Sequence, residues 1–344
     1  MSQIQLNSTR IVGDFLQPYI VAELNTSHFG DVEKAKEMIQ SAKKAGCDCV
    51  KFQSWSEDSL YSETYYTENP MARRFIKRFS FSADELLLLS EYCRNLEIDF
   101  ASTPYSKEEV DFLVNKCHVP FLKVASMDLV NLDLLAHMAS SQFPMILSTG
   151  MGTIAEIEKA VQTITKKGNT SICILHCVSL YPTQTKEMNL QNILGLRESF
   201  SNFPIGFSDH SEGSSLAIAA TALGAALIEK HFTLDKTKIG MDNQMAMESD
   251  ELTRMIRGCK DVFESLGKKD RVVSDPEVSQ RKIMRRSLVS TREISVGEIL
   301  SRADITFKRP GNGIQISDLD SVIGKRIVRS IPKDSIIEPS NLEP

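Results

Sequence analysis

The sequence predicts an α/β protein: a TIM (β/α)8 barrel followed by a small β-rich domain. Two observations predict the barrel. Short apolar runs rich in β-forming residues alternate with amphipathic helical patterns, and eight such runs occur before residue 234. Strands that alternate with helices form parallel sheets, and eight such units close into a barrel. A third observation predicts the second domain, because the pattern changes to short strands and turns after residue 283.

The eight predicted strands are short and mostly apolar. In chain order they are PYIVAEL (18–24), DCVKFQ (48–53), IDFASTP (98–104), PFLKVAS (120–126), PMILSTG (144–150), SICILHC (171–177), PIGFSDH (204–210) and AALIEKHFT (225–233). An open doubly wound sheet is the alternative. Such a sheet usually has fewer strands and a glycine-rich loop after the first, whereas the turn NTSHFGD (25–31) holds a single glycine.

Helical patterns with apolar residues at i, i+3 and i+4 lie between these runs. Clear examples are DVEKAKEMIQSAKKAG (31–46), SADELLLLSEYCRNL (82–96), SKEEVDFLVNKC (106–117) and TIAEIEKAVQTITKKG (153–168). The expected N-caps are Asp31, Ser82, Ser106 and Thr153, and the expected stops are Gly46 and Gly168. A helix at about 248–266 ends the barrel.

We expect residues 1–266 to form the barrel, 267–282 a polar linker and 283–344 the small domain. A chain of 344 residues suits this division, because a single core rarely grows past roughly 250–300 residues. A domain of about 60 residues buries little core alone and gains from docking against another surface.

The composition is that of an ordinary globular protein, with 42% hydrophobic and 25% charged residues. A net charge of −5 without a long basic block argues against nucleic-acid binding. We expect no signal peptide, because residues 1–15 lack an apolar core, and no membrane span, because no apolar run approaches about 20 residues. The seven cysteines are odd in number and mostly lie in apolar stretches, so we expect reduced thiols and a cytoplasmic location.

Polar or ionisable residues end every predicted strand. They are Glu23; Lys51 and Gln53; Ser102 and Thr103; Lys123, Ser126 and Asp128; Ser148 and Thr149; His176; Ser208, Asp209 and His210; and Glu229, Lys230 and His231. The reactive groups of a TIM barrel gather at the C-terminal ends of its strands. Any one of these residues could have a purely structural role, as a polar group with its hydrogen bonds satisfied. A barrel without a functional site would not need polar groups at the ends of all eight strands. The set therefore predicts an active site.

These residues form two chemical sets. Cations and hydroxyls suit an anionic phosphate and carboxylate; they are Lys51, Thr103, Lys123, Ser126, Ser148 and Ser208. His210, His231 and Glu23 are metal-ligand types, and neighbouring strands about 4.8 Å apart would let both imidazoles reach one ion. Asp242, after the eighth strand, could add a ligand.

The other histidines carry weaker signals. His118 and His137 fall on helices or loops away from the strand ends, and His28 is a weak candidate for contact with a substrate. For His176, a structural role as a hydrogen-bonded core histidine and a functional role are equally good interpretations.

The segments AELNTSHFGD, VKFQ, STPYS, LKVAS, ILSTGM, LHC with YPT, GFSDHS, ALGAALIEKHFTLD and KRPGNG follow in this order along nearly the whole chain. Together they resemble the sialic acid synthase family, which makes nine-carbon sugar acids such as N-acetylneuraminate, legionaminate and pseudaminate. GFSDHS and IEKHFTLD before a KRPGNG tail form a very specific combination. The tail resembles the SAF (antifreeze-like) domain attached to these synthases.

The resemblance implies a transferase that condenses phosphoenolpyruvate with an open-chain N-acylated hexosamine and releases phosphate. The implied phosphoenolpyruvate-binding residues are Lys51, Thr103, Lys123, Ser126, Ser148, Ser179 and Ser208. His210 and His231 match ligands of a divalent ion, usually Mn²⁺, with Mg²⁺ or Co²⁺ possible. Glu23 and Gln53 match active-site groups, and together with the two histidines they form the catalytic set. The implied sugar contacts are Gln53, Tyr181, Asp242 and Arg309.

Four positions depart from the pattern of N-acetylneuraminate synthases. Ser27 precedes His28 where those enzymes have asparagine, Asp128 replaces a glutamate, Ser179 replaces an asparagine that helps bind phosphoenolpyruvate, and GMDN (240–243) replaces a GPD-type loop. These departures leave the sugar open between N-acetylmannosamine and a 2,4-diacetamido-6-deoxy hexose.

Two other functions fit the same barrel. A Schiff-base aldolase would use Lys51 or Lys123 as its nucleophile. A non-catalytic sugar-binding protein would keep the fold but would not need the histidine pair.

The expected assembly is a homodimer with exchanged C-terminal domains. In the family, the arginine of KRPGNG reaches the barrel of the neighbouring subunit, and Arg309 stands at that position.

Overall fold

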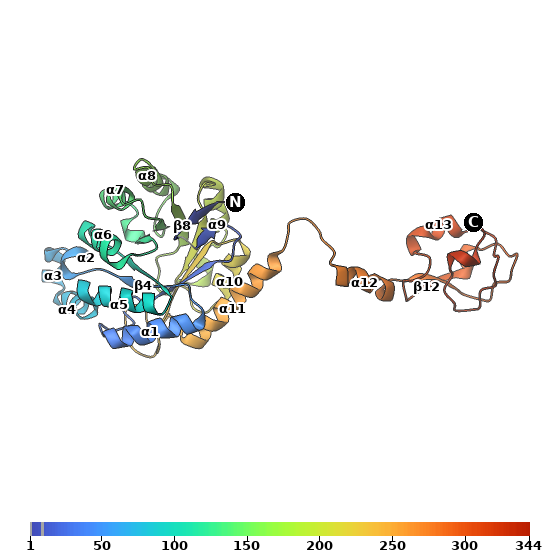
Figure 1. Cartoon of the computed structure of the whole chain (residues 1–344), viewed down its shortest axis with the longest axis horizontal. Coiled ribbons are helices and arrows are strands. Elements are labelled where there is room, and N and C mark those ends of the chain that lie inside the picture. Colours follow the sequence, from blue (N-terminus) through green and yellow to red (C-terminus); the bar gives the residue numbers. More distant parts are fainter. Residues whose placement is uncertain (1, 8–9) are drawn as a thin grey trace. The chain divides into compact units, whose positions relative to one another are not determined.

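A computed structural model of the chain describes residues 2–7 and 10–344. It contains two compact units, residues 1–267 and 268–344. In the first unit helices surround a set of central strands (Figure 1). No helix within the described ranges has the length and apolarity that crossing a membrane requires.

The first unit is an eight-stranded parallel barrel. Its strands are β3 (Tyr19–Glu23), β4 (Cys49–Gln53), β5 (Asp99–Thr103), β6 (Leu122–Val124), β7 (Met145–Ser148), β8 (Ile172–Cys177), β9 (Ile205–Asp209) and β10 (Leu227–His231). They pair in the order β5-β4-β3-β10-β9-β8-β7-β6, and the two end strands, β5 and β6, also lie in contact. Each predicted run holds one strand, and the predicted barrel is confirmed.

A helix follows each strand and packs outside it. These helices are α1 (Val32–Ala45), α5 (Ala83–Asn95), α6 (Lys107–Phe112), α7 (Leu132–Ser140), α8 (Ile154–Thr165), α9 (Asn192–Ser199), α10 (Ser215–Ala222) and α11 (Ser249–Leu266). The four predicted N-caps are confirmed: Asp31, Ser82, Ser106 and Thr153 each accept a backbone N–H in the first turn of a helix. Gly46 ends α1 in the left-handed conformation with φ 100°.

Two features of the barrel unit carry no strong sequence pattern. An N-terminal hairpin joins β1 (Gln3–Gln5) to β2 (Ile11–Gly13), and its apolar side chains pack with Tyr19 and Phe121 near the starts of the central strands. Three short helices follow β4 before α5: α2 (Glu57–Leu60), α3 (Glu63–Glu68) and α4 (Pro70–Phe79).

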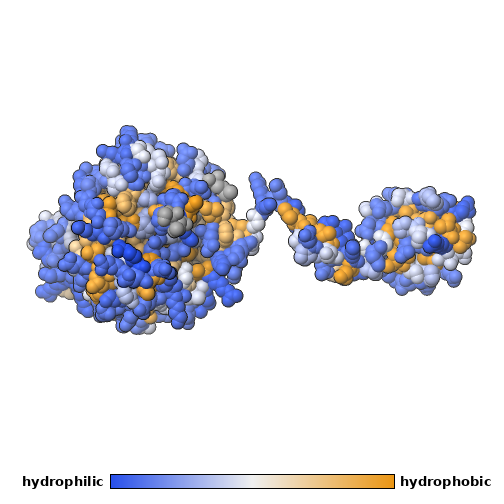
Figure 2. Space-filling view, in the orientation of Figure 1, coloured by the Kyte–Doolittle hydropathy of each residue, from blue (hydrophilic) through white to orange (hydrophobic). Residues whose placement is uncertain are grey.

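Two apolar layers hold the barrel. The larger lies between the strands and the outer helices, and the smaller joins the N-terminal hairpin to the barrel interior. On β3, Ile20 and Ala22 belong to the outer layer and Tyr19 and Val21 to the inner one, as the twofold alternation of a strand requires. The visible face of the unit is mostly hydrophilic, with scattered apolar side chains (Figure 2).

The second unit begins with α12 (Asp275–Met284) and continues as a small β-rich fold. Antiparallel strands β11 (Ser287–Ser290) and β12 (Ile305–Lys308) pair, and the short helix α13 (Leu319–Val322) follows. The unit has its own apolar core, built by ten buried residues that include Leu288, Ile327 and Ile337.

The stretch expected as a linker, 267–282, is not extended throughout. Ser274 caps α12 through the backbone N–H of Glu277, and Pro276 stands in its first turn, where proline is tolerated. A helix advances about 1.5 Å per residue against about 3.3 Å for an extended chain, so this stretch reaches less far than its length suggests.

Candidate active site

A cavity of about 360 Å³ opens at the C-terminal ends of the barrel strands. Each of the eight strands contributes at least one lining side chain: Glu23, Lys51, Gln53, Thr103, Lys123, Ser148, Cys177, Ser208, Glu229 and His231. Pairs such as Glu229 and His231 share the cavity because residues two apart point to the same side of a strand. The strand ends therefore converge on one site, as expected for a TIM barrel.

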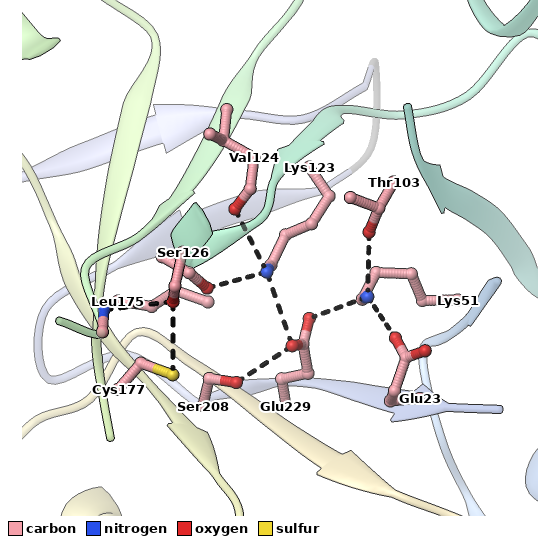
Figure 3. A network of polar contacts seen from close by, with 12 residues as sticks. Glu23, Lys51, Thr103, Lys123, Val124, Ser126, Leu175, Cys177, Ser208 and Glu229 are labelled. Atoms are coloured by element: carbon pink, nitrogen blue, oxygen red, sulfur yellow. Dashed lines mark hydrogen bonds and ion pairs between the residues drawn. The ribbon is translucent and has the colours of Figure 1, made fainter. Parts of the chain in front are cut away.

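A buried network of two lysines and two carboxylates forms the floor of the cavity (Figure 3). Lys51 Nζ pairs with Glu23 and lies 3.8 Å from Glu229 Oε2. Lys123 Nζ lies 3.5 Å from Glu229 Oε1. Glu229 thus lies between the two cations, and all four side chains are almost fully buried.

Hydroxyl groups complete this floor. Lys51 donates to Thr103 Oγ1 at 3.1 Å, and Lys123 donates to Ser148 Oγ at 2.7 Å. The Ser208 hydroxyl donates to Glu229 Oε1 at 3.0 Å. Five of the six residues predicted to bind an anion therefore form one network around Glu229: Lys51, Lys123 and Ser208 lie next to its carboxylate, and Thr103 and Ser148 bond to the two lysines.

Burial disfavours charge on these groups, and the ion pairs oppose it. Burial alone would lower the pKa of Lys51, but Glu229 and Glu23 outweigh it and raise that pKa. Burial would raise the pKa of Glu229, but Lys123 and Lys51 bring it below its ordinary value. Burial lowers the pKa of Lys123 despite Glu229, and it raises the pKa of Glu23 despite Lys51. Lys51 and Glu229 are therefore the most firmly charged members of the floor.

Gln53 is oriented by two hydrogen bonds. The Tyr105 hydroxyl donates to Gln53 Oε1 at 2.6 Å, and Gln53 Nε2 donates to Glu23 Oε1 at 2.9 Å. The backbone N–H of Asn25 donates to the same Glu23 oxygen at 2.9 Å. Tyr105 thus fixes which end of the Gln53 amide faces Glu23, and Glu23 is held as an acceptor.

His210 and His231 form one wall of the cavity, with ring centroids 5.3 Å apart. Tyr181 stacks on His210 at 4.2 Å. His210 Nδ1 bonds to the Val178 carbonyl oxygen at 2.8 Å, which leaves Nε2 of that ring available. Burial, His210 and nearby lysines hold the pKa of His231 well below its ordinary value, which favours the neutral ring.

Polar residues lie near His210 and His231, but they do not form a compact cluster of metal ligands around the two rings. Asp242 Oδ2 lies 3.9 Å from His231 Nδ1 and accepts a hydrogen bond from Asn25. Within residues 2–7 and 10–344, no group of three or more His, Cys, Asp or Glu side chains is gathered as a metal site.

A second buried ion pair lies behind the wall. Lys230 Nζ is 2.8 Å from Asp209 Oδ2, and both side chains are at most 1% exposed. Asp209 Oδ1 accepts from the backbone N–H and the hydroxyl of Ser211, at 2.8 Å and 2.7 Å. These bonds fix the chain on both sides of His210.

Glycine is required where the backbone approaches the hydroxyls of Ser126 and Ser179. A Cβ on Gly150 would collide with both side chains, and the Gly150 N–H donates to Ser126 Oγ at 3.1 Å. Ser179 Oγ is buried and, among the described residues, has no hydrogen-bond partner.

The structure brings together nearly all the predicted site residues. The cavity is lined by Glu23, Lys51, Gln53, Thr103, Lys123, Ser126, Ser148, Ser179, Tyr181, Ser208, His210, His231 and Asp242. Arg309 belongs to the C-terminal unit, where it is exposed just after β12. His28 is not a lining residue: its ring stacks on Phe81 at 4.1 Å and lies 5.9 Å from Phe52.

Sequence reasoning gave no role to several lining residues. Glu229 was named only as a polar strand end, although its position two residues before His231 on one strand indicates the same face. Cys177 was interpreted as a structural thiol, yet it lines the cavity 3.9 Å from His210 Nδ1. Trp55 and Tyr105 lie in loops, where no periodic pattern shows which way a side chain points.

The chain matches known proteins along nearly its whole length. Residues 38–271 match the model of the NeuB family, and residues 285–343 match that of the SAF domain. An uncharacterised protein of Methanocaldococcus jannaschii is 38% identical over 98% of each chain. The N,N'-diacetyllegionaminic acid synthase of Legionella pneumophila is 32% identical over 95% of each chain. The crystal structure of N-acetylneuraminic acid (sialic acid) synthetase from Leptospira borgpetersenii, in complex with citrate, has a TM-score of 0.74 and 33% identity, covering 81% of this chain and 96% of that one.

The barrel and its cavity define a TIM-barrel enzyme with a lysine–carboxylate floor and a histidine pair in one wall. The chain belongs to the NeuB family, and its C-terminal unit is a SAF domain. It is an enzyme of the synthase type. The family resemblance that the sequence motifs predicted is confirmed.

Proposed function

We propose that this chain is a nonulosonic acid synthase, which condenses phosphoenolpyruvate with an open-chain N-acylated hexosamine and releases phosphate. One observation carries the proposal: Lys51 and Lys123 both lie beside Glu229 on the floor of a cavity that also presents two imidazoles, His210 and His231. The relatives named as synthases of legionaminic and sialic acids support it.

The floor supplies the groups that phosphoenolpyruvate needs. Lys51 and Lys123 would bind its phosphate and carboxylate, and hydroxyls would donate further hydrogen bonds without adding charge. These hydroxyls belong to Thr103, Ser126, Ser148, Ser179 and Ser208. The same groups would stabilise the negative charge that grows on the departing phosphate.

The histidine pair suits a divalent ion, for which we propose Mn²⁺. A metal-binding histidine usually donates its other ring N–H to a carbonyl or carboxylate, and the His210 Nδ1 contact with Val178 O has this form. A neutral imidazole is the form that binds metals, and burial together with His210 and nearby lysines lowers the pKa of His231, which favours that form. A divalent ion held by His210 and His231 would act as a Lewis acid toward the sugar aldehyde.

Glu23 and the surrounding polar groups would act on the sugar and on water. Gln53, Tyr181 and Asp242 would hold the sugar hydroxyls. Glu23, held as an acceptor by Gln53, would take the proton of the water that adds at C2 of the former phosphoenolpyruvate. Holding both substrates in one buried cavity lowers the entropic cost of their encounter.

Phosphate release tests this proposal. Phosphoenolpyruvate, an N-acylated hexosamine and Mn²⁺ together should yield free phosphate, and omission of the sugar should abolish it. His210→Ala and His231→Ala should lose most activity. Near-normal activity of both variants after treatment with a chelator would overturn the metal assignment, and failure to release phosphate with any acylated sugar would overturn the proposal and favour a sugar-binding protein.

One observation favours a Schiff-base aldolase as the second candidate. Burial lowers the pKa of Lys123, as a nucleophilic amine requires. The lysine nevertheless lies 3.5 Å from a carboxylate and donates to Ser148, which favours its charged form. Borohydride with pyruvate separates the two functions, because the synthase forms no imine and should not be trapped.

We also propose a homodimer with exchanged C-terminal domains, in which Arg309 completes the partner's site by contacting the N-acyl group of the sugar. The family resemblance of KRPGNG supports this assembly. A cytoplasmic location is proposed on the basis of the cysteines, since all seven are buried and free.

A further inference from the structure

A second cavity, of about 550 Å³, lies outside the barrel strands between α8 and α9. The helix α8 contributes Ile154 and Ile157 to its lining, and α9 contributes Asn192, Gly195 and Leu196. We call this space the outer cavity, to distinguish it from the active-site cavity at the strand ends. A cavity of this volume is large enough for a small-molecule ligand.

His176 reaches the outer cavity from the end of β8. On this strand Ile172 and Ile174 pack in the layer between the strands and the outer helices, so His176, two residues further on, points the same way. Its side chain is buried and lines the outer cavity but not the active-site cavity. The sequence left His176 open between a structural and a functional role, and the proposed reaction gives it none.

The hydrogen bond of His176 fixes which ring nitrogen is free. Its Nε2 lies 2.7 Å from the carbonyl oxygen of Met188. A carbonyl oxygen only accepts, so Nε2 carries the hydrogen, and Nδ1 of the neutral ring is an acceptor. Burial lowers the pKa of His176, which favours the neutral ring. Among the described residues, none bonds to Nδ1. A ligand in the outer cavity that carries an N–H or O–H group could donate to this nitrogen.

Gly195 leaves the α9 side of the outer cavity open. Glycine inside a helix is less favourable than alanine. Neither backbone nor packing requires it here, because its φ is not positive and an added Cβ would meet no atom within 4 Å. Since Gly195 lines the outer cavity, the absence of a side chain keeps room for a ligand.

The lining of the outer cavity is uncharged. In the part of the chain that the structure describes, no Asp, Glu, Lys or Arg side chain contributes to it, whereas two lysines and two carboxylates form the floor of the active-site cavity. Moving a charged group into such a space costs its hydration without an opposite charge in return. Ile154, Ile157 and Leu196 instead offer apolar surface. The lining therefore suits a neutral molecule with an apolar body.

We infer that the outer cavity is a second ligand site, which binds an uncharged molecule with an apolar ring and one N–H or O–H donor, and that this donor bonds to Nδ1 of His176. The inference goes beyond the proposed function. It concerns binding alone, so it can fail while the synthase stands, and it can hold if the proposed reaction is wrong.

Indole is the probe that tests this site, because it is a neutral apolar ring with one N–H donor. Titration of the full-length protein, followed by ligand-observed NMR, measures its affinity. 1-Methylindole replaces the donor by a methyl group, and indole-3-carboxylate keeps the N–H but adds a negative charge. We expect indole to bind and each of the other two to bind at least about tenfold more weakly, because one leaves Nδ1 without a partner and the other buries an unpaired charge.

Two variants of α9 locate the binding. Gly195→Phe places a ring at the open side of the cavity and should weaken indole binding at least about tenfold. Glu198→Phe puts the same ring on the same helix, at an exposed position outside the lining, and should bind indole as the wild type does. Thermal unfolding shows that both variants are folded.

Each contrary outcome removes a definite part of the inference. No binding of indole up to its solubility limit overturns the site. Binding that Gly195→Phe leaves unchanged overturns its location between α8 and α9. Equal affinity for indole and 1-methylindole overturns the role of His176 Nδ1, and equal affinity for indole-3-carboxylate overturns the preference for an uncharged ligand.

Discussion

Glu229 is the residue on which the charge balance of the site depends. It lies between Lys51 and Lys123, and Glu23 pairs with Lys51, so two buried cations face two buried carboxylates. Buried charges persist only when they are paired and hydrogen-bonded. The polar strand ends were predictable because parallel strands end at one edge. The contacts of Glu229 were not, since they depend on which side chains meet across the barrel.

Lys123→Met tests the anion-binding floor. A lost charge-assisted bond costs about 1.5–3 kcal/mol, so KM for phosphoenolpyruvate should rise roughly 10- to 150-fold. KM for the sugar should change much less. Steady-state kinetics in each substrate measure this, with exposed Lys77→Met as control. A larger effect on the sugar would mean that the two substrates occupy the opposite halves of the cavity.

Lys230→Met tests the ion pair behind the histidine wall. The substitution leaves Asp209 buried without its cation, which should cost about 3–5 kcal/mol of unfolding free energy. Urea unfolding followed by fluorescence measures the loss, because Trp55, the single tryptophan, lies in the barrel unit. Adding Asp209→Asn should restore part of the stability. A loss below about 1 kcal/mol in the single variant would contradict this role.

At the scale of elements, the regular parts of the barrel were predictable and the insertions were not. The helices with caps and a 3.6-residue period, such as α1 and α8, were expected close to their observed bounds. The helices α2, α3 and α4 span only four to ten residues each, too short to show a period. His28, in the first loop, was only a weak candidate for contact with a substrate, and tertiary packing buries that ring against Phe81.

The buried His28 should make barrel stability depend on pH. Burial lowers its pKa from 6.5 to about 3, with Lys34 adding to the effect and Asp31 opposing it. The unfolded chain therefore takes up a proton below pH 6.5 that the folded chain refuses. This contribution is complete above pH 6.5 and falls by about 1.4 kcal/mol per unit as pH drops toward 3.

Urea unfolding of the wild type and His28→Phe at pH 7 and pH 5 measures this contribution. Between these values the wild type should lose about 2 kcal/mol more than the variant. Phe81→Leu loosens the same stack without removing a titrating group, so it should keep the wild-type difference. Equal pH dependence in wild type and His28→Phe would show that folding does not lower the pKa of this ring.

At the scale of the whole molecule, the chain forms two separate cores. This explains why the sequence pattern changes near residue 283, from alternating strands and helices to short strands and turns. The barrel core and the ten-residue core of the second unit share no member. The helix α12 was missed because its sequence is polar and none of its residues is buried. Periodicity reveals a helix mainly through its buried face, and α12 has none within its own unit.

Exchange of the C-terminal domains is tested by mixing two inactive variants. Arg309 is exposed on the loop after β12, followed by cis Pro310 and then Gly311. In the proposed dimer Arg309→Ala spoils the site of the partner chain, whereas His231→Ala spoils the site of its own chain. A mixed dimer therefore contains one barrel with both histidines that receives an intact arginine, and equal mixing makes half of all dimers mixed. We expect about a quarter of wild-type activity to return after subunit exchange, measured as phosphate release. Native mass spectrometry confirms that mixed dimers form. If they form and no activity returns, Arg309 acts within its own chain or plays no part in the site.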